Sequence, residues 1–336
     1  MWNNKRFLGF ALATVLLLGV ALTGCSDSKG DIKVKVGEVT RSVFYAPEYV
    51  ALEKGFFKEE GLDVDLQTIA GGDKTMTALL SGAIDVALVG SETSIYVYQQ
   101  GTDDPVINFA QLTQTDGTFL VARDKTDNFD WNQLKGKDFL GQRKGGMPQM
   151  AGEFTLKKHG IHPQQDLKLI QNVDFANIAP AFVSGTGQYV QLFEPQASIF
   201  EKEGKGHVVA SFGVESGPLP YTVFMSKQSY IKKNADTVQK FTNALQKAQI
   251  WVAQHKPEEI ADAILPYFKN TERDIIVSAV KRYQAQGTYA PDAVLDDAEW
   301  NNLLNVMTQA GELKKTVPLS AIVDNQFADK AKATVK

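Results

Sequence analysis

The feature that most constrains the fold of this chain is a regular alternation of strand-like and helix-like segments that begins at residue 32. Residues 32–39 (IKVKVGEV) alternate apolar and polar side chains, as the residues of a half-buried strand do. The segments that follow predict a helix at 47–54, a strand at 62–69, a helix at 71–80, a strand at 85–89 and a helix at 91–101. This order is typical of βαβ units and predicts a parallel sheet.

The same alternation returns in the middle of the chain. The sequence there predicts a strand at 135–141, a helix at 149–158, a strand at 167–173, a helix at 176–183 and a strand at 189–193. Two apolar segments rich in β-branched residues, 108–121 and 208–224, are interpreted as extended strands that cross from one α/β unit to the other and back.

The last third of the chain is predicted to be helical. Apolar residues at intervals of three and four mark one helix face at Val238, Phe241, Leu245, Ala248 and Val252, and further helices are predicted at 257–267, 272–286 and 296–310. The whole pattern predicts an α/β protein with two lobes: residues 32–114 and 220–336 form lobe 1, and residues 115–219 form lobe 2. The two crossover strands between the lobes would act as a hinge that permits closure around a ligand.

The composition excludes several classes of protein. The 336 residues correspond to about two domains, and 43% apolar with 22% charged residues is ordinary for a globular protein. Thirty-five basic and 39 acidic residues give a net charge of −4 without any block of like charge, so we expect no nucleic-acid partner. A single cysteine excludes an internal disulfide, and His159 and His162 lack the companion ligands that a metal site needs.

The first 25 residues resemble a bacterial lipoprotein signal. Lys5 and Arg6 precede an apolar run at 7–23, which is short for a membrane span of about 20 residues, and the sole cysteine follows Leu-Thr-Gly as in a lipobox. We therefore expect residues 1–24 to be a signal peptide, Cys25 to carry lipid and residues 25–31 to form a tether. The protein would then lie on the outer face of the cytoplasmic membrane. The alternative is a signal anchor that contains a lone apolar cysteine.

Several motifs resemble those of one protein family. They are residues 49–64 (YVALEKGFFKEEGLDV), Gly-Gly-Asp at 71–73, Leu-Ser-Gly at 80–82, Ile-Asp-Val-Ala at 84–87 and Gly90, with Glu-Pro at 194–195 and Pro-Tyr-Thr at 220–222 in addition. The chain resembles substrate-binding proteins of ABC importers, in the group that takes sulfonates, nitrate or thiamine-type (Thi5-like) pyrimidines. The resemblance implies a type II periplasmic-binding-protein fold, a monomer, a small-molecule ligand, and a membrane permease with its ATPase as partners. It implies no catalytic residue and no cofactor.

We expect the ligand-binding residues in the loops that follow the strands, because ligands of open α/β sheets bind beyond the carboxyl ends of the strands. Phe44 and Tyr45 are expected to be either core residues or aromatic walls for a ring, and Tyr45 is the better wall because of its polar tip. Most candidates also have a structural explanation, because glycines serve turns and Ser, Thr or Asp side chains cap helices. The candidates are Arg41, Ser42, Tyr45, Gly72, Asp73, Lys74, Thr75, Ser91, Glu92, Thr93, Arg143, Gly146, Phe175 and Glu194.

The charged candidates favour two different ligands. Arginines and lysines in these loops (Arg41, Lys74, Arg143 and Lys144) could pair with a sulfonate or a carboxylate. In the cleft, Glu92 and Glu194 would repel a sulfonate and would instead accept hydrogen bonds from a nitrogen heterocycle, such as a thiamine-type pyrimidine. The alternative for either glutamate is a position that faces solvent or the permease. Glu92 is therefore expected to matter for binding more than Ser91, although a carboxylate in the first turn of a helix is also stabilised by the helix dipole.

The sequence offers little support for an enzyme. It contains no phosphate loop that ends in Gly-Lys-Ser/Thr, no dinucleotide fingerprint with its third glycine and no Gly-x-Ser-x-Gly elbow. The enzymatic alternative is a pyrimidine-synthesising enzyme of the Thi5-like group. The export signal opposes this alternative, because that synthesis belongs inside the cell.

Overall fold

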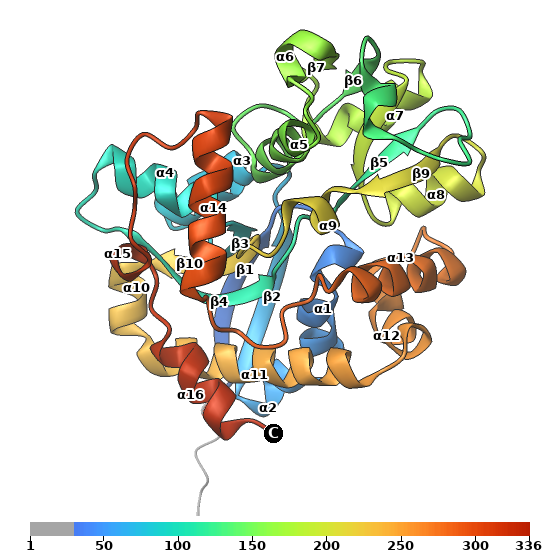
Figure 1. Ribbon diagram of the computed structural model, residues 1–336. Helices are drawn as coiled ribbons and strands as arrows, with labels where there is room; N and C mark the ends of the chain where they lie inside the picture. The colour runs from blue at the N-terminus through green and yellow to red at the C-terminus, as the bar shows by residue number, and fades with distance from the viewer. Residues whose placement is uncertain (1–29) are drawn as a thin grey trace, which may run out of the picture. The chain divides into compact units, whose positions relative to one another are not determined.

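The computed structural model describes residues 30–336, which contain two sheets of five strands each (Figure 1). The first sheet has the order β2-β1-β3-β10-β4, with β1 parallel to both β2 and β3 and with β10 antiparallel to β3 and β4. The sheet is therefore mixed, and only its first three strands have the predicted parallel arrangement. Its strands are β1 (Ile32–Glu38), β2 (Leu62–Thr68), β3 (Val86–Gly90), β4 (Val106–Thr113) and β10 (Thr222–Lys227).

The helices between these strands confirm the predicted alternation. They are α1 (Ala46–Glu53), the short α2 (Phe56–Glu59), α3 (Gly72–Ser81) and α4 (Glu92–Gln100). The bounds of α1, α3 and α4 agree with the sequence-based ones to within a residue or two, whereas no helix was predicted at α2. The consequence for function is that α3 and α4 both begin at the carboxyl ends of strands, β2 and β3 respectively.

The second sheet has the order β7-β6-β8-β5-β9 and is mixed in the same way. Its strands are β5 (Thr118–Ala122), β6 (Asp138–Leu140), β7 (Lys168–Ile170), β8 (Tyr189–Phe193) and β9 (His207–Ser211), and its helices are α5 (Met147–Lys158), α6 (Pro163–Asp166), α7 (Ile178–Val183) and α8 (Gln196–Lys202). The strand predicted at 167–173 is shorter than expected. The reason is that β7 is an edge strand whose only partner, β6, is itself three residues long.

The chain passes between the sheets twice, and the prediction of two extended crossovers is correct for the first passage only. Residues 114–117 connect β4 directly to β5. On the way back, the short helix α9 (Phe212–Ser216) interrupts the chain between β9 and β10. The Ser211 hydroxyl accepts a hydrogen bond from the Val214 amide and so caps this helix, and Gly217, with a φ of 73°, ends it.

The C-terminal part is helical, as predicted, and it completes the core of the first sheet. The apolar stripe predicted around Phe241 lies on α11 (Ala235–Gln254) and is buried, with Phe241 in contact with Phe57, Phe109 and Phe224. In Figure 1, α11 runs beneath the first sheet, where it packs against α1, α2 and α16. The remaining helices are α10 (Gln228–Lys233), α12 (Pro257–Ile264), α13 (Arg273–Gln286), α14 (Asp297–Ala310), α15 (Leu319–Ile322) and α16 (Gln326–Thr334).

Three expectations concern residues at the start of the chain. The signal peptide, Cys25 and most of the tether lie outside the described residues, so they stay predictions. Across residues 30–336, no helix combines the length and the apolar character that a membrane span requires.

Candidate functional site

A cavity of about 370 Å³ lies where the carboxyl ends of strands from both sheets face each other. We call it the central cavity. Its size is within the usual range for small-molecule sites, about 300–1,000 Å³. From the side of the first sheet it is lined by Val39, Thr40, Tyr45, residues 70–74, Val89, Gly90, Glu92, Thr93, Tyr96, Tyr221 and Thr222, and from the side of the second sheet by residues 142–148, residues 174–177 and Phe193.

Glu92 is the one carboxylate that is buried in the wall of the central cavity. Its side chain follows Gly90, the last residue of β3, and stands in the first turn of α4. The residue is only 4% exposed. Its Oε1 accepts a hydrogen bond from the Met147 amide at 3.1 Å, and its Oε2 has no partner among the described residues. Glu92, a residue that lines the cavity, thus has one buried carboxylate oxygen without a hydrogen-bond partner among the described residues.

Burial favours the uncharged form of the Glu92 carboxyl group. Desolvation raises the pKa of this carboxyl to about 7, against the opposing effect of hydrogen bonds from the amides of Glu92 and Met147. Gly90 makes room for the group, since a Cβ at that position would lie 2.1 Å from Glu92 Oε2. The Met147 amide belongs to the N-terminus of α5, a helix of the second sheet, so Glu92 connects the two sides of the cavity.

Aromatic side chains form much of the remaining wall. Tyr45 and Tyr221 are 5% and 4% exposed, and Phe44 packs behind them with ring-centroid distances of 5.6 and 5.4 Å. Tyr96 lies one helical turn after Glu92 and donates its hydroxyl to Gly145 O at 3.1 Å. Flat apolar faces with polar edges suit an aromatic ring better than a compact inorganic anion.

An ion pair lies at the rim of the central cavity. Arg143 Nη2 lies 2.8 Å from Asp73 Oδ2, and Arg143 Nη1 lies 3.6 Å from Asp174 Oδ1. Partial burial acts to raise the pKa of Asp73, but the hydrogen bond and the charge of Arg143 outweigh it and lower the pKa. The charge of Arg143 is therefore used by two carboxylates.

The structure brings most of the predicted residues to the central cavity. Nine of the candidates line it: Tyr45, Gly72, Asp73, Lys74, Glu92, Thr93, Arg143, Gly146 and Phe175. Thr75 and Ser91 are fully buried and do not line it, because their hydroxyls donate to backbone carbonyls, to Ile69 O and Gly71 O for Thr75 and to Pro220 O for Ser91.

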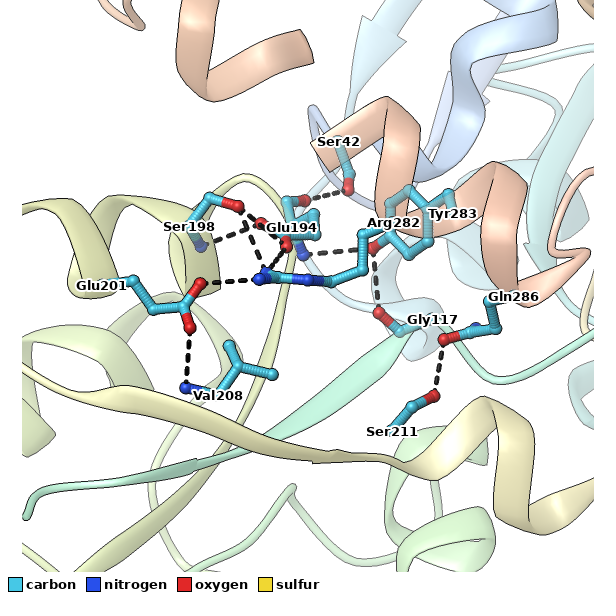
Figure 2. A network of polar contacts seen from close by, with 10 residues as sticks. All are labelled: Ser42, Gly117, Glu194, Ser198, Glu201, Val208, Ser211, Arg282, Tyr283 and Gln286. Atoms are coloured by element: carbon cyan, nitrogen blue, oxygen red, sulfur yellow. Dashed lines mark hydrogen bonds and ion pairs between the residues drawn. The ribbon is translucent and has the colours of Figure 1, made fainter. Parts of the chain in front are cut away.

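The other three candidates, Arg41, Ser42 and Glu194, line a neighbouring cavity of about 410 Å³, which we call the lateral cavity. Its lining residues include Thr40, Gln142, Phe175, Ala176 and Phe193, which also line the central cavity, so the two are adjacent. The carboxylate of Glu194 is occupied within the protein. Ser198 donates to it through its amide at 2.9 Å and its hydroxyl at 3.0 Å, and Arg282 forms an ion pair with it (Figure 2).

Sequence reasoning missed several residues of the central cavity. Tyr96 could have been predicted, because it follows Glu92 by four residues and so lies on the same face of a predicted helix. Gln142 and Phe193 lie at the ends of predicted strands, where the ligand loops were expected, but neither was among the candidates; Tyr221 had no such local signal. They reach the cavity from segments whose meeting depends on the packing of the two sheets.

Solved structures of other proteins have the same fold. The chain is similar to the alkanesulfonate-binding protein SsuA from Xanthomonas axonopodis pv. citri bound to MOPS, with a TM-score of 0.70 and 16% identity over 87% of this chain and 98% of that one. It is also similar to the periplasmic nitrate-binding protein NrtA from Synechocystis PCC 6803, with a TM-score of 0.72 and 17% identity over 91% and 89% of the two chains. These similarities confirm the predicted periplasmic-binding-protein fold.

Residues 43–260 match the family model described as NMT1/THI5 like, and the chain belongs to this family. YtlA of Bacillus subtilis (strain 168), which carries the name of a binding protein, is 62% identical over 98% of each chain. The formylaminopyrimidine-binding protein of Halalkalibacterium halodurans is 26% identical over 76% of this chain and 78% of that protein. The relatives are named as binding proteins and not as enzymes, so the chain is a solute-binding protein with the periplasmic-binding-protein fold.

Proposed function

We propose that this protein captures a nitrogen heterocycle with N–H donors, of the thiamine-pyrimidine type, for an ABC import system. The observation that carries the proposal is the free Oε2 of Glu92, which is buried in an aromatic-walled cavity. An amino group or ring N–H would give this oxygen the partner that it lacks. A hydrogen bond to a charged acceptor is worth about 1.5–3 kcal/mol.

A sulfonate fits this cavity less well. Its oxygens would approach the Glu92 carboxylate, which would have to take up a proton, because burying two like charges side by side costs much desolvation and repulsion energy. The guanidinium that could offset the charge, Arg143, is already paired with Asp73 and Asp174. The relative named for binding a formylaminopyrimidine supports the heterocycle in preference to the sulfonate.

Ligand capture would involve closure of two lobes, residues 32–114 with 220–336 and residues 115–219. Three contacts span the central cavity and would form on closure: Glu92 with the Met147 amide, Tyr96 with Gly145 O, and Asp73 with Arg143. A ligand held between these pairs favours the closed arrangement, because it contacts both sides only there. The closed protein, a monomer, would then deliver the ligand to a permease that is driven by an ATPase.

The proposed place of action is the outer face of the cytoplasmic membrane, with lipid on Cys25 as the anchor. A diacyl modification of Cys25 would attach the protein stably, because two acyl chains hold a protein on a membrane where one chain binds only marginally. The tether would leave the two cavities free to meet solute outside the membrane.

Isothermal titration tests the choice of ligand. A neutral aminopyrimidine, an alkanesulfonate and nitrate are titrated into the purified protein under the same conditions. We expect the aminopyrimidine to bind and the two anions to bind more weakly or not at all. Tighter binding of the alkanesulfonate or of nitrate would refute the proposed ligand class and leave the solute-binding fold in place.

A further inference from the structure

The lateral cavity has donor groups of its own, and the proposed function does not use them. It lies beside the central cavity, and five residues line both. We propose that the lateral cavity is a second ligand subsite, which takes a carboxylate substituent of the ligand whose ring occupies the central cavity. This inference rests on the proposed function and extends it to the other end of the ligand.

Arg41 is held in a fixed position in the wall of the lateral cavity. Its Nε lies 3.0 Å from Glu38 Oε1, and its Nη2 donates to Thr68 Oγ1 at 3.2 Å. Its guanidinium carbon also lies 5.3 and 5.5 Å from the ring centroids of Tyr49 and Tyr267. These contacts leave Nη1 without a hydrogen bond among the described residues. A guanidinium fixed in this way offers a ready donor to a carboxylate, at little cost in side-chain entropy.

The charges around the lateral cavity favour an anion. Lys269 adds a second cation to the wall, at an exposed position. The carboxylate in the same wall, Glu194, is buried and neutralised by Arg282, with Ser198 as a further donor (Figure 2). Glu38 offsets the charge of Arg41, so Lys269 remains as the uncompensated charge at this cavity.

Gln142 connects the two subsites. It is 3% exposed, it lines both cavities, and its Nε2 donates to Gln191 O at 2.7 Å. That hydrogen bond fixes the orientation of the amide, because a carbonyl oxygen needs a donor. Gln142 Oε1 is then an acceptor, with no hydrogen bond among the described residues. The two cavities together therefore match a ligand with N–H donors on its ring, a donor in its linker and a carboxylate at its far end.

The test compares three probes by isothermal titration. Each is a methyl-aminopyrimidine with an aminomethyl arm, and the arm carries a formyl group, a succinyl group with a free carboxylate, or the methyl ester of that succinyl group. The ester has nearly the length of the acid without its charge. We expect the acid to bind about tenfold tighter than the ester, as one charge-assisted hydrogen bond would give.

Variants then assign the preference to the lateral cavity. Arg41→Lys keeps a cation beside Glu38 but loses the forked donor, and Lys269→Glu reverses a charge at an exposed position. Both should reduce the acid-to-ester ratio to about threefold or less, with formyl-probe binding unchanged in Lys269→Glu. Lys233→Glu makes the same charge change at an exposed residue outside both cavities, so it should keep the full ratio. Thermal melting of each variant checks that it is folded.

The outcomes separate the inference from the proposed function. Equal binding of acid and ester to the unmodified protein would overturn the second subsite, while binding of the formyl probe would still support the heterocycle site. A preference for the acid that persists in both Arg41→Lys and Lys269→Glu would place the carboxylate elsewhere and overturn the inference as well. If no probe binds, the proposed function fails and the inference fails with it.

Discussion

At the scale of single residues, two glutamates that follow strands in the same way have different roles. Glu92 keeps one oxygen free in the central cavity, whereas both oxygens of Glu194 are used by Ser198 and Arg282. The sequence could predict that each lies near a strand end. It could not separate them, because Arg282 is 88 residues away from Glu194 along the chain and only the packing of α13 brings the two together.

The first prediction concerns Glu92→Gln. The amide keeps the size of the side chain but removes the charged acceptor, so affinity for a neutral aminopyrimidine should fall by about 1.5–3 kcal/mol. The melting temperature of the ligand-free variant should not fall, since an amide is cheaper to bury than a carboxylate. Ser91→Ala is the matched control. The Ser91 hydroxyl donates a hydrogen bond to Pro220 O, so its loss should lower the free energy of unfolding by about 1 kcal/mol and leave the affinity for the ligand unchanged. An unchanged affinity of Glu92→Gln for the aminopyrimidine would show that Glu92 only stabilises the helix α4 and does not contact the ligand.

The second prediction concerns pH. The pKa of Glu92 is raised from 4.5 to about 7, so the folded protein holds this proton more tightly than the unfolded chain does. Its contribution to stability is then full below about pH 4.5 and is lost as pH rises through about 7. A ligand that donates to the carboxylate needs the ionised form, so affinity should fall about tenfold per pH unit below about pH 7.

Titrations across this pH range check the second prediction, with Glu92→Gln as the reference. The variant should show a flat profile, apart from the protonation of the ligand itself. A profile in the variant that matches that of the unmodified protein would show that another group is responsible.

At the scale of elements, α13 holds segments of the second sheet against the C-terminal part of the chain (Figure 2). Tyr283 accepts from the Glu194 amide at 3.1 Å and donates to Gly117 O at 2.8 Å. Arg282 Nη2 donates to Glu201 Oε2 at 2.6 Å, in addition to its ion pair with Glu194. Burial acts to raise the pKa of Glu194, and the charge of Arg282 opposes that rise.

The third prediction tests this role of α13. Arg282→Met would leave the fully buried carboxylate of Glu194 without its cation, so we expect the free energy of unfolding to fall by about 3–5 kcal/mol. Lys202→Met is the matched control, because it breaks the ion pair between Lys202 and Glu272, whose side chains are 45% and 74% exposed. The free energy of unfolding of this variant should fall by less than about 1 kcal/mol. Denaturant unfolding measures both. Similar losses for the two variants would contradict a structural role for the buried pair.

The elements also mark where local sequence patterns cease to be informative. The helix stripe on α11 and the alternation in β1 follow from side-chain periodicity, so both could be predicted. The short α9 depends on a single cap at Ser211, and the length of β7 depends on its neighbour β6. A short helix that depends on one hydrogen bond, or a strand length that depends on a partner strand, cannot be predicted from the periodicity of the side chains.

At the scale of the whole molecule, ligand binding should make the protein more compact. The contacts of Glu92 with Met147, Tyr96 with Gly145 and Asp73 with Arg143 span the central cavity, and a ligand between them favours the closed population. Small-angle X-ray scattering should therefore give a smaller radius of gyration with saturating aminopyrimidine than without it. An unchanged profile, in a sample in which calorimetry verifies saturation, would argue against closure as the capture mechanism.

The proposed attachment to the membrane also concerns the whole chain. Cys25 is its only cysteine, so Cys25→Ala should not incorporate lipid, and it should give either an uncleaved precursor or protein that is lost from lipid-linked fractions. Ser26→Ala is the control and should be both lipid-labelled and cleaved. Incorporation of labelled fatty acid into Cys25→Ala would contradict the proposed anchor.

The most direct test of the central claim is the identity of the ligand that the protein selects from its host. The unmodified protein and Glu92→Gln are incubated with the same cell extract, washed and denatured, and the released small molecules are identified by mass spectrometry. We predict a nitrogen heterocycle with N–H donors from the unmodified protein and much less of it from Glu92→Gln. Release of a sulfonate or another simple anion, or equal release of the heterocycle from both proteins, would contradict the account.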